Sequence, residues 1–214
     1  QFEEHGAVKH HYNRFDGWSI FSNGKYQRVE DPKEIRLHIR KFLSKCYITK
    51  KHRNQNGQIR QYKEKLKKQS SGFVSDILEA LAALPDVHLL PSQKSPCSLD
   101  GTLNASYTIA THNQLIDIST RPYKIVPVSH NFYTLNYLSY NYDKSAFSEK
   151  WGQFLVDITI GDLDLMLLLQ QWCGYLLLPT LKYQKFVICY GDGANGKGVF
   201  FDTIAAALGK KNVS

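Results

Sequence analysis

The 214-residue sequence has no C-x-x-C pair, no long apolar run and no signal peptide. Its four cysteines, at 46, 97, 173 and 189, are scattered, which argues against a structural zinc site and fits a reducing compartment. Its most apolar segment, 163–178, is interrupted by Asp164, two glutamines and Gly174, whereas a membrane helix needs roughly 18 apolar residues in a row. The first residues are acidic and lack an apolar core. We therefore expect no metal site, no membrane association and a cytoplasmic location.

A second absence concerns acidic side chains that could work in pairs. The aspartates that might carry chemistry are isolated or stand at helix starts: Asp100, Asp117, Asp157, Asp162 and Asp164. The sequence therefore offers no polymerase-like acidic pair. It also lacks an initial methionine and ends soon after Lys197, so we expect a fragment of a longer protein.

What is present indicates a folded, basic protein. Hydrophobic residues make up 43% of the chain and charged residues 21%, which excludes global disorder. The net charge of +8 makes an anionic partner plausible, although solubility alone can also favour such a charge.

Local patterns predict alternating small strands and helices. The Asn23-Gly24 pair is typical of a type I′ hairpin turn, and Asp31-Pro32 is typical of a helix start. We expect a hairpin over 17–29 and a helix from 32 whose apolar face consists of Ile35, Ile39, Phe42, Leu43 and Cys46. A second helix is expected over 72–84, with Phe73, Ile77, Leu78, Leu81 and Leu84 buried. Strands over 107–111 and 115–119, an extended segment over 123–142, and helices over 147–157 and 162–173 should follow.

The last segment contains a candidate phosphate-binding loop. A short apolar run, 185–190, predicts a buried strand, and 199–208 predicts a helix. Between them stands Gly191-x-x-x-x-Gly196-Lys197, where backbone N–H groups at a helix start can bind phosphate and the lysine can reach the β- and γ-phosphates of ATP. We assign the catalytic role to Lys197. The candidate ATP-binding residues are Gly191, Asp192, Gly193, Ala194, Asn195, Gly196, Lys197 and Gly198. The alternative is an ordinary glycine-rich turn.

This loop departs from the usual pattern at the magnesium position. A Ser or Thr normally follows the lysine, and its hydroxyl binds Mg²⁺. Here Gly198 and Val199 follow, and Thr203 is more than a helical turn away. Either water takes this place on Mg²⁺, or magnesium binding depends on acids outside the chain.

Several segments resemble a known family. The sequence GDGANGKG is similar to the phosphate loop of superfamily 3 helicases of phages, plasmids and poxviruses. Segments 113–118 and 136–142 resemble a strand and a tyrosine-rich segment of phage and plasmid primase–helicases, although Gln114 stands where glycine is usual. Segment 151–178 resembles the helical region before the helicase, through Phe154, Asp157, Leu167, Trp172, Gly174, Tyr175 and Leu176.

The resemblance implies part of a ring-forming, ATP-dependent DNA helicase, often fused to a primase, that acts on single-stranded or forked DNA in replication. The fold class that we expect is α+β: a mixed linker domain followed by the first strand–loop–helix unit of an α/β P-loop NTPase. The expected domains are a basic linker over 1–146, winged-helix-like over about 32–90, then a helical connector over 147–184 and the edge of the helicase over 185–214. A phage, plasmid or integrated element in a bacterial cell fits as the source.

Two further segments are candidates for contact with nucleic acid. The basic segment 50–68 either binds phosphates or forms a solvated loop; its cations are Lys50, Lys51, Arg53, Arg60, Lys63, Lys65, Lys67 and Lys68. Aromatic residues crowd 132–142, where they form either a core and interface, which we favour, or a stacking platform for single strands.

Three functions remain open from the sequence. The first is the helicase fragment, from which we expect no ATP hydrolysis because most of the catalytic site is missing. The second is a nucleotide kinase, which the position of the loop near the end of the chain disfavours. The third is a non-enzymatic DNA-binding or oligomerisation module with a vestigial loop.

Overall fold

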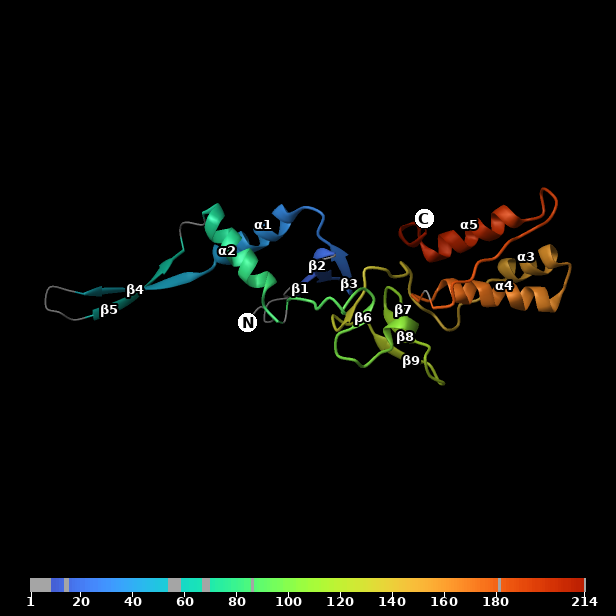
Figure 1. Cartoon of the computed structure of the whole chain (residues 1–214), viewed down its shortest axis with the longest axis horizontal. Coiled ribbons are helices and arrows are strands. Elements are labelled where there is room, and N and C mark those ends of the chain that lie inside the picture. Colours follow the sequence, from blue (N-terminus) through green and yellow to red (C-terminus); the bar gives the residue numbers. More distant parts are fainter. Residues whose placement is uncertain are drawn as a thin grey trace. The chain divides into compact units, whose positions relative to one another are not determined.

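A computed structural model (Figure 1) describes residues 9–13, 16–53, 59–66, 70–85, 87–180 and 182–213. The fold is α+β, with α-helices and small antiparallel sheets, as the sequence predicts. Contacts between residues divide the chain into two compact units. Unit 1 comprises Gln1–Ser22 and Gln27–Lys94, and unit 2 comprises Asn23–Tyr26 and Ser95–Ser214. The domain boundaries that we expect at 146 and 184 stay predictions.

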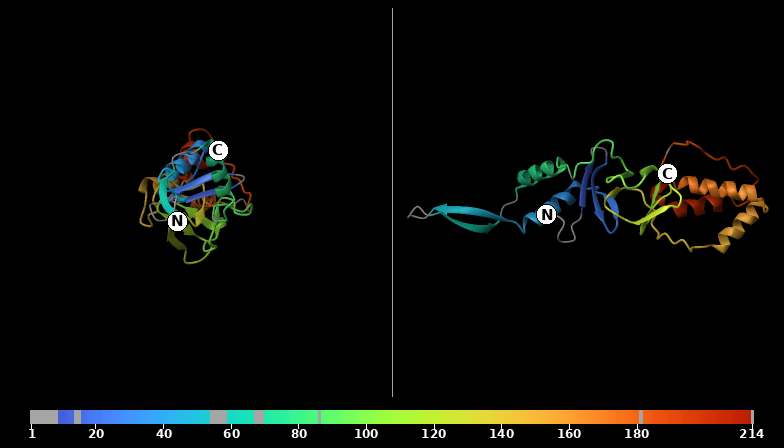
Figure 2. Two further views of the ribbon diagram at one scale, coloured as in Figure 1. Left: turned by 90° about the vertical axis from the view of Figure 1, so that its left-hand side faces the viewer. Right: turned by 90° about the horizontal axis from the view of Figure 1, so that it is seen from below.

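Unit 1 is built from a small sheet, two helices and a separate β-hairpin (Figure 2). The sheet has the order β1-β2-β3, from Lys9–Asn13, Gly17–Ser22 and Lys25–Arg28, and the first two residues of β3 are assigned to unit 2. The helices are α1 (Pro32–Leu43) and α2 (Ser71–Ala82). Between them in the sequence lie β4 (Tyr47–Arg53) and β5 (Ile59–Lys65), which pair with each other.

The predicted turn and helix starts are confirmed. Asn23 and Gly24 both have positive φ, 51° and 75°, as a type I′ turn requires. At the start of α1, the Asp31 carboxylate accepts a hydrogen bond from the Lys33 N–H at 2.8 Å. Ser70 caps α2 in the same way, through the Phe73 N–H at 3.2 Å. These caps satisfy N–H groups that have no partner within a helix.

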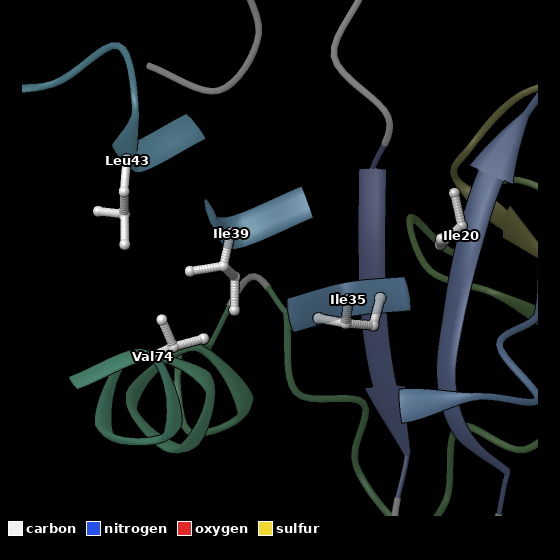
Figure 3. Close-up of a cluster of buried hydrophobic side chains, with 5 residues drawn as sticks. All are labelled: Ile20, Ile35, Ile39, Leu43 and Val74. Carbon is white, nitrogen blue, oxygen red and sulfur yellow. The ribbon is translucent and has the colours of Figure 1, made fainter. Parts of the chain in front are cut away.

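The core of unit 1 lies where α1, α2 and β2 meet (Figure 3). Its buried side chains are Ile20, Ile35, Ile39, Leu43 and Val74. The predicted face of α2 needs a correction, because Val74 is fully buried whereas Phe73 is 41% exposed and Leu84 47% exposed. Ile77, Leu78 and Leu81 do pack against this core. Positions 73 and 74 both lie three or four residues from 77, so helical spacing alone does not choose between them.

Unit 2 begins with two small antiparallel sheets. One has the order β7-β8-β9, from Thr108–Ala110, Gln114–Asp117 and Lys124–Pro127, and the other pairs β6 (Cys97–Ser98) with β10 (Phe132–Tyr133). One hydrophobic cluster of this unit contains the buried side chains of Leu103, Ala110, Leu115 and Phe132. The strands predicted at 107–111 and 115–119 are therefore present, slightly shorter than expected.

Asn113 joins two of the segments that carry the family resemblance. Its side-chain oxygen accepts a hydrogen bond from the Tyr142 N–H at 2.8 Å, and its amide donates to the Tyr142 carbonyl at 3.3 Å. The Leu138 N–H donates to the Ala110 carbonyl at 2.8 Å. The tyrosine-rich segment is thus hydrogen-bonded along the β7–β8 turn.

Three helices complete unit 2 within the described residues. They are α3 (Glu149–Thr159), α4 (Leu163–Leu176) and α5 (Lys197–Leu208). Ser148 and Asp162 cap α3 and α4 through their side chains. Gly174 lies inside α4, so the helix end predicted there is wrong by a turn. A single glycine costs a helix only about 1 kcal/mol, which the surrounding leucines outweigh.

Candidate functional sites

The glycine-rich loop leads directly into α5. Gly196 is the residue before the first helical turn, with φ of 82°, and in the described structure no side chain caps the helix there. The first intrahelical bond runs from the Phe200 N–H to the Gly196 carbonyl at 2.9 Å. The N–H groups of the first turn therefore lack partners within the helix, and such groups bind anions, aided by the helix dipole.

The Lys197 ammonium occupies the inside of this loop. It donates to the Gly191 carbonyl at 2.8 Å, the Asp192 carbonyl at 2.9 Å and the Asn195 side-chain oxygen at 2.7 Å. These three oxygens therefore hold the ammonium inside the loop. A phosphate group entering the loop would offer the ammonium charged oxygens, which make stronger hydrogen bonds than neutral carbonyls.

Glycine is required at one position of the loop for two independent reasons. A Cβ on Gly196 would lie 2.7 Å from Cγ2 of Ile158 and 3.2 Å from Cε2 of Phe154, and the positive φ also disfavours a side chain. No atom lies within 4 Å of a Cβ built on Gly193. Of these two glycines, Gly196 is therefore the one whose lack of a side chain the packing against helix α3 requires.

Helix α3 supports the loop through stacked aromatic rings. The Trp151 ring stacks on Phe200 of α5, with centroids 5.9 Å apart and planes 15° apart, and on Phe154 at 5.4 Å. Phe200 and Ile204 are buried. Sequence reasoning missed this supporting role, although the aromatic residues three apart on α3, Trp151 and Phe154, mark the face that packs.

The expected strand before the loop is not formed. Residues 185–190 have no strand partner in the described part of the chain, and Phe186, Ile188 and Tyr190 are 81%, 78% and 97% exposed. A β-strand satisfies its N–H and C=O groups only by pairing with another strand, so apolar sequence alone does not make one. The strand–loop–helix unit of a P-loop NTPase is therefore not shown.

Thr203, the hydroxyl-bearing residue that follows the lysine on α5, uses its side chain within its own helix. The Thr203 hydroxyl donates to the Val199 carbonyl of its own helix at 2.7 Å. Over the described residues, no three His, Cys, Asp or Glu side chains come close enough together to hold a metal ion. No helix within the described ranges is long and apolar enough to span a membrane.

The basic segment forms a β-hairpin, which sequence reasoning missed. All residues of β4, and all of β5 except Glu64, are exposed. Lys50 forms an ion pair with Glu64 at 2.6 Å, and this hydrogen bond raises the pKa of Lys50. Lys51, Arg53, Arg60, Lys63 and Lys65 also lie on the two strands. Lys67 and Lys68 lie outside the described residues, as does the Asn56-Gly57 pair, whose residue types predict a turn.

The tyrosine-rich segment is largely structural. Phe132 and Tyr133 are buried, and the Tyr133 ring packs edge-on against Tyr26 with centroids 5.0 Å apart. The Tyr26 hydroxyl donates to the His130 carbonyl. Tyr140, by contrast, is 44% exposed. The aromatic residues of β10 therefore form part of a core, as the favoured interpretation predicts.

The fold defines the general class: an α+β protein with small antiparallel sheets, one of which is an exposed basic hairpin. The family is more specific. The chain belongs to the D5 N terminal like family, whose model matches residues 3–160 and which forms the N-terminal domain of phage, plasmid and poxvirus primase–helicase proteins. No curated protein matches the chain. The match ends before the glycine-rich loop, so it identifies the N-terminal domain and leaves the helicase part to be tested.

Proposed function

We propose that this chain supplies the linker and the ATP-binding loop of a superfamily 3 DNA helicase, within a primase–helicase that unwinds DNA during replication. Membership of the D5 N terminal like family supports the primase–helicase context and an interaction with DNA. The helicase part rests on residues 191–198, which lie beyond the family match. In this proposal ATP is the cofactor, with Mg²⁺ bound mainly by groups outside the chain.

The observation that carries the proposal is the lysine held inside a loop at an uncapped helix start. The Lys197 ammonium is hydrogen-bonded to oxygens of residues 191–195, and Lys197 itself is the first residue of α5, whose first N–H groups have no partner within the helix. A triphosphate would bind there through the helix N–H groups and the lysine together. The packing of Phe200 on Trp151 fixes α5 to α3, which belongs to the matched family domain.

The full assembly that we propose is a homo-oligomeric ring. Helix α4 is rich in leucine and has no buried residue, and Leu163, Leu167 and Leu168 are more than half exposed. A contiguous exposed apolar surface of this kind is typical of a site of contact with another protein surface. Contact with neighbouring subunits, or with the rest of a helicase domain, would cover this surface.

Nucleotide binding to the whole chain tests the proposal. We expect a fluorescent ATP analogue to bind and inorganic pyrophosphate to compete with it, because the loop recognises phosphate. Lys197→Ala should weaken binding about ten- to a hundred-fold, the usual effect of losing charged hydrogen bonds. Lys210→Ala removes the same charge from an exposed site outside the loop and should change nothing. Equal binding by wild type and Lys197→Ala would refute the proposal.

The proposal does not extend to ATP hydrolysis by residues 1–214. A P-loop NTPase also needs a Walker B aspartate, a water-positioning residue and an arginine finger, and the 191–198 loop supplies none of these. We therefore expect residues 1–214 to bind ATP without hydrolysing it. A phosphate-release assay that found turnover in the wild type, lost in Lys197→Ala, would contradict this expectation.

A further inference from the structure

The pairing of β4 with β5 sorts the cations of the hairpin onto two different faces. Side chains alternate along a strand, and residues directly opposite one another on paired strands share a face. One face, here called face A, consists of the pairs Tyr47–Lys65, Thr49–Lys63, Lys51–Gln61 and Arg53–Ile59. The other, face B, consists of the pairs Ile48–Glu64, Lys50–Tyr62 and His52–Arg60.

Face A carries one cation in every pair and no acid. From the base of the hairpin to its tip the cations are Lys65, Lys63, Lys51 and Arg53, and each has an uncharged residue opposite. Cations two residues apart on one strand are separated by roughly 7 Å, because a strand rises about 3.3 Å per residue. Lys63 and Lys51 are diagonal neighbours across the ribbon, at a similar spacing of about 7–8 Å. Face A is therefore an evenly spaced row of four positive charges.

Face B is different in charge and in chemistry. Its only acid, Glu64, pairs with Lys50 at 2.6 Å, so that ammonium already has a carboxylate partner. Face B also carries Tyr62, the aromatic residue in the middle of the hairpin. The two faces belong to one ribbon, yet only face A presents a row of cations without an acid.

We infer that face A binds the phosphodiester backbone of duplex DNA, an inference that rests on the DNA-binding part of the proposed function. A row of cations without acids neutralises successive phosphates and releases their counterions. Proteins that bind single strands place aromatic side chains among the cations so that bases stack on them. Among the eight residues of face A the aromatic one is Tyr47, in the pair at the base, and the other three cations stand opposite Thr49, Gln61 and Ile59. A two-stranded ribbon also has the size that the major groove of B-DNA admits.

The salt dependence of DNA binding by the full chain tests this inference. On duplex DNA each phosphate contact contributes about −0.9 to the slope of log affinity against log salt concentration. Lys63→Ala and Lys51→Ala should each reduce the magnitude of the slope by about 0.9, and the double variant by about 1.8. Lys50→Ala, with the same change of charge on face B, should leave the slope unchanged. Circular dichroism would verify that the variants, all at exposed positions, remain folded.

Three other results would each contradict one part of the inference: the role of face A, the choice of duplex DNA, or DNA binding itself. An equal loss of slope for Lys50→Ala and Lys63→Ala would mean diffuse attraction by net charge and would refute the role of face A. Tighter binding of a single strand than of a duplex of the same length would refute the choice of duplex DNA. No binding of either at low salt would remove the DNA-binding part of the proposed function as well, whereas ATP binding is decided separately by Lys197→Ala.

Discussion

At the residue scale, two glycines two positions apart should respond in opposite ways to the same substitution. Gly196→Ala places a Cβ 2.7 Å from Ile158 in a backbone conformation with positive φ, so we expect a loss of about 1–3 kcal/mol in the free energy of unfolding. Gly198→Ala lies in helix α5 with no atom within 4 Å of the new Cβ, and should be neutral or stabilising by up to about 1 kcal/mol. Denaturant titration of both variants tests this. A harmless Gly196→Ala would contradict the contact between the loop and α3.

Asp100 gives a second prediction at this scale, through pH. Its carboxylate accepts hydrogen bonds from the Thr102 N–H, the Thr102 hydroxyl and the Ser98 hydroxyl, and these bonds, the first foremost, lower the pKa of Asp100 to about 2. An unfolded aspartate has a pKa near 3.9. A lowered folded-state pKa contributes stability that is fully present above about pH 4 and is lost as the pH falls through about 2.

Asp100→Asn should therefore be less stable than the wild type at pH 7, and the difference should shrink between about pH 4 and pH 2. Unfolding curves recorded across that range measure the difference directly. If the difference in free energy of unfolding between the wild type and Asp100→Asn stayed constant down to pH 2, the negative charge of Asp100 would contribute nothing to stability.

At the scale of elements, the attachment of α5 to α3 should depend on one ring. Phe200 is buried and stacks on Trp151, so Phe200→Ala should cost about 3–5 kcal/mol, the usual effect of truncating a buried phenylalanine. Its neighbour Phe201 is 42% exposed, and Phe201→Ala should cost about 1 kcal/mol. Chemical unfolding compares the two. Tryptophan emission should shift to longer wavelength in Phe200→Ala alone, because that change exposes Trp151.

Elements with a local chemical signal could be predicted from the sequence. The caps at Asp31 and Asp162 and the Asn23-Gly24 turn fix their own backbone, so the helices and the hairpin that they start are present. The β4–β5 hairpin was missed because its strands are basic and exposed on both faces, which hides the alternation of apolar and polar residues. Segment 185–190 shows the reverse, since its apolar pattern predicts a strand that has no partner here.

The candidate sites, too, have some features that could be predicted from the sequence and others that could not. The loop residues 191–198 could be identified because phosphate binding needs glycines and a lysine at a fixed spacing, which the sequence displays. The contacts of Gly196 with Phe154 and Ile158 could not, because they join residues about forty positions apart along the chain. The two faces of the hairpin could not be separated either, since the register of Lys63 opposite Thr49 depends on a turn whose length the composition does not fix.

At the scale of the whole molecule, the two candidate sites belong to different compact units, the hairpin to unit 1 and the loop to unit 2. We therefore expect their binding activities to be separable in the full chain, because substitutions without shared contacts have nearly additive effects. Lys51→Ala combined with Lys63→Ala should weaken duplex binding and leave the affinity for the ATP analogue unchanged. Lys197→Ala should do the opposite. Titrating each of the two variants with duplex DNA and with the ATP analogue gives four affinities to compare with the wild type. A variant that lost both binding activities while remaining folded would show that one surface binds both DNA and nucleotide.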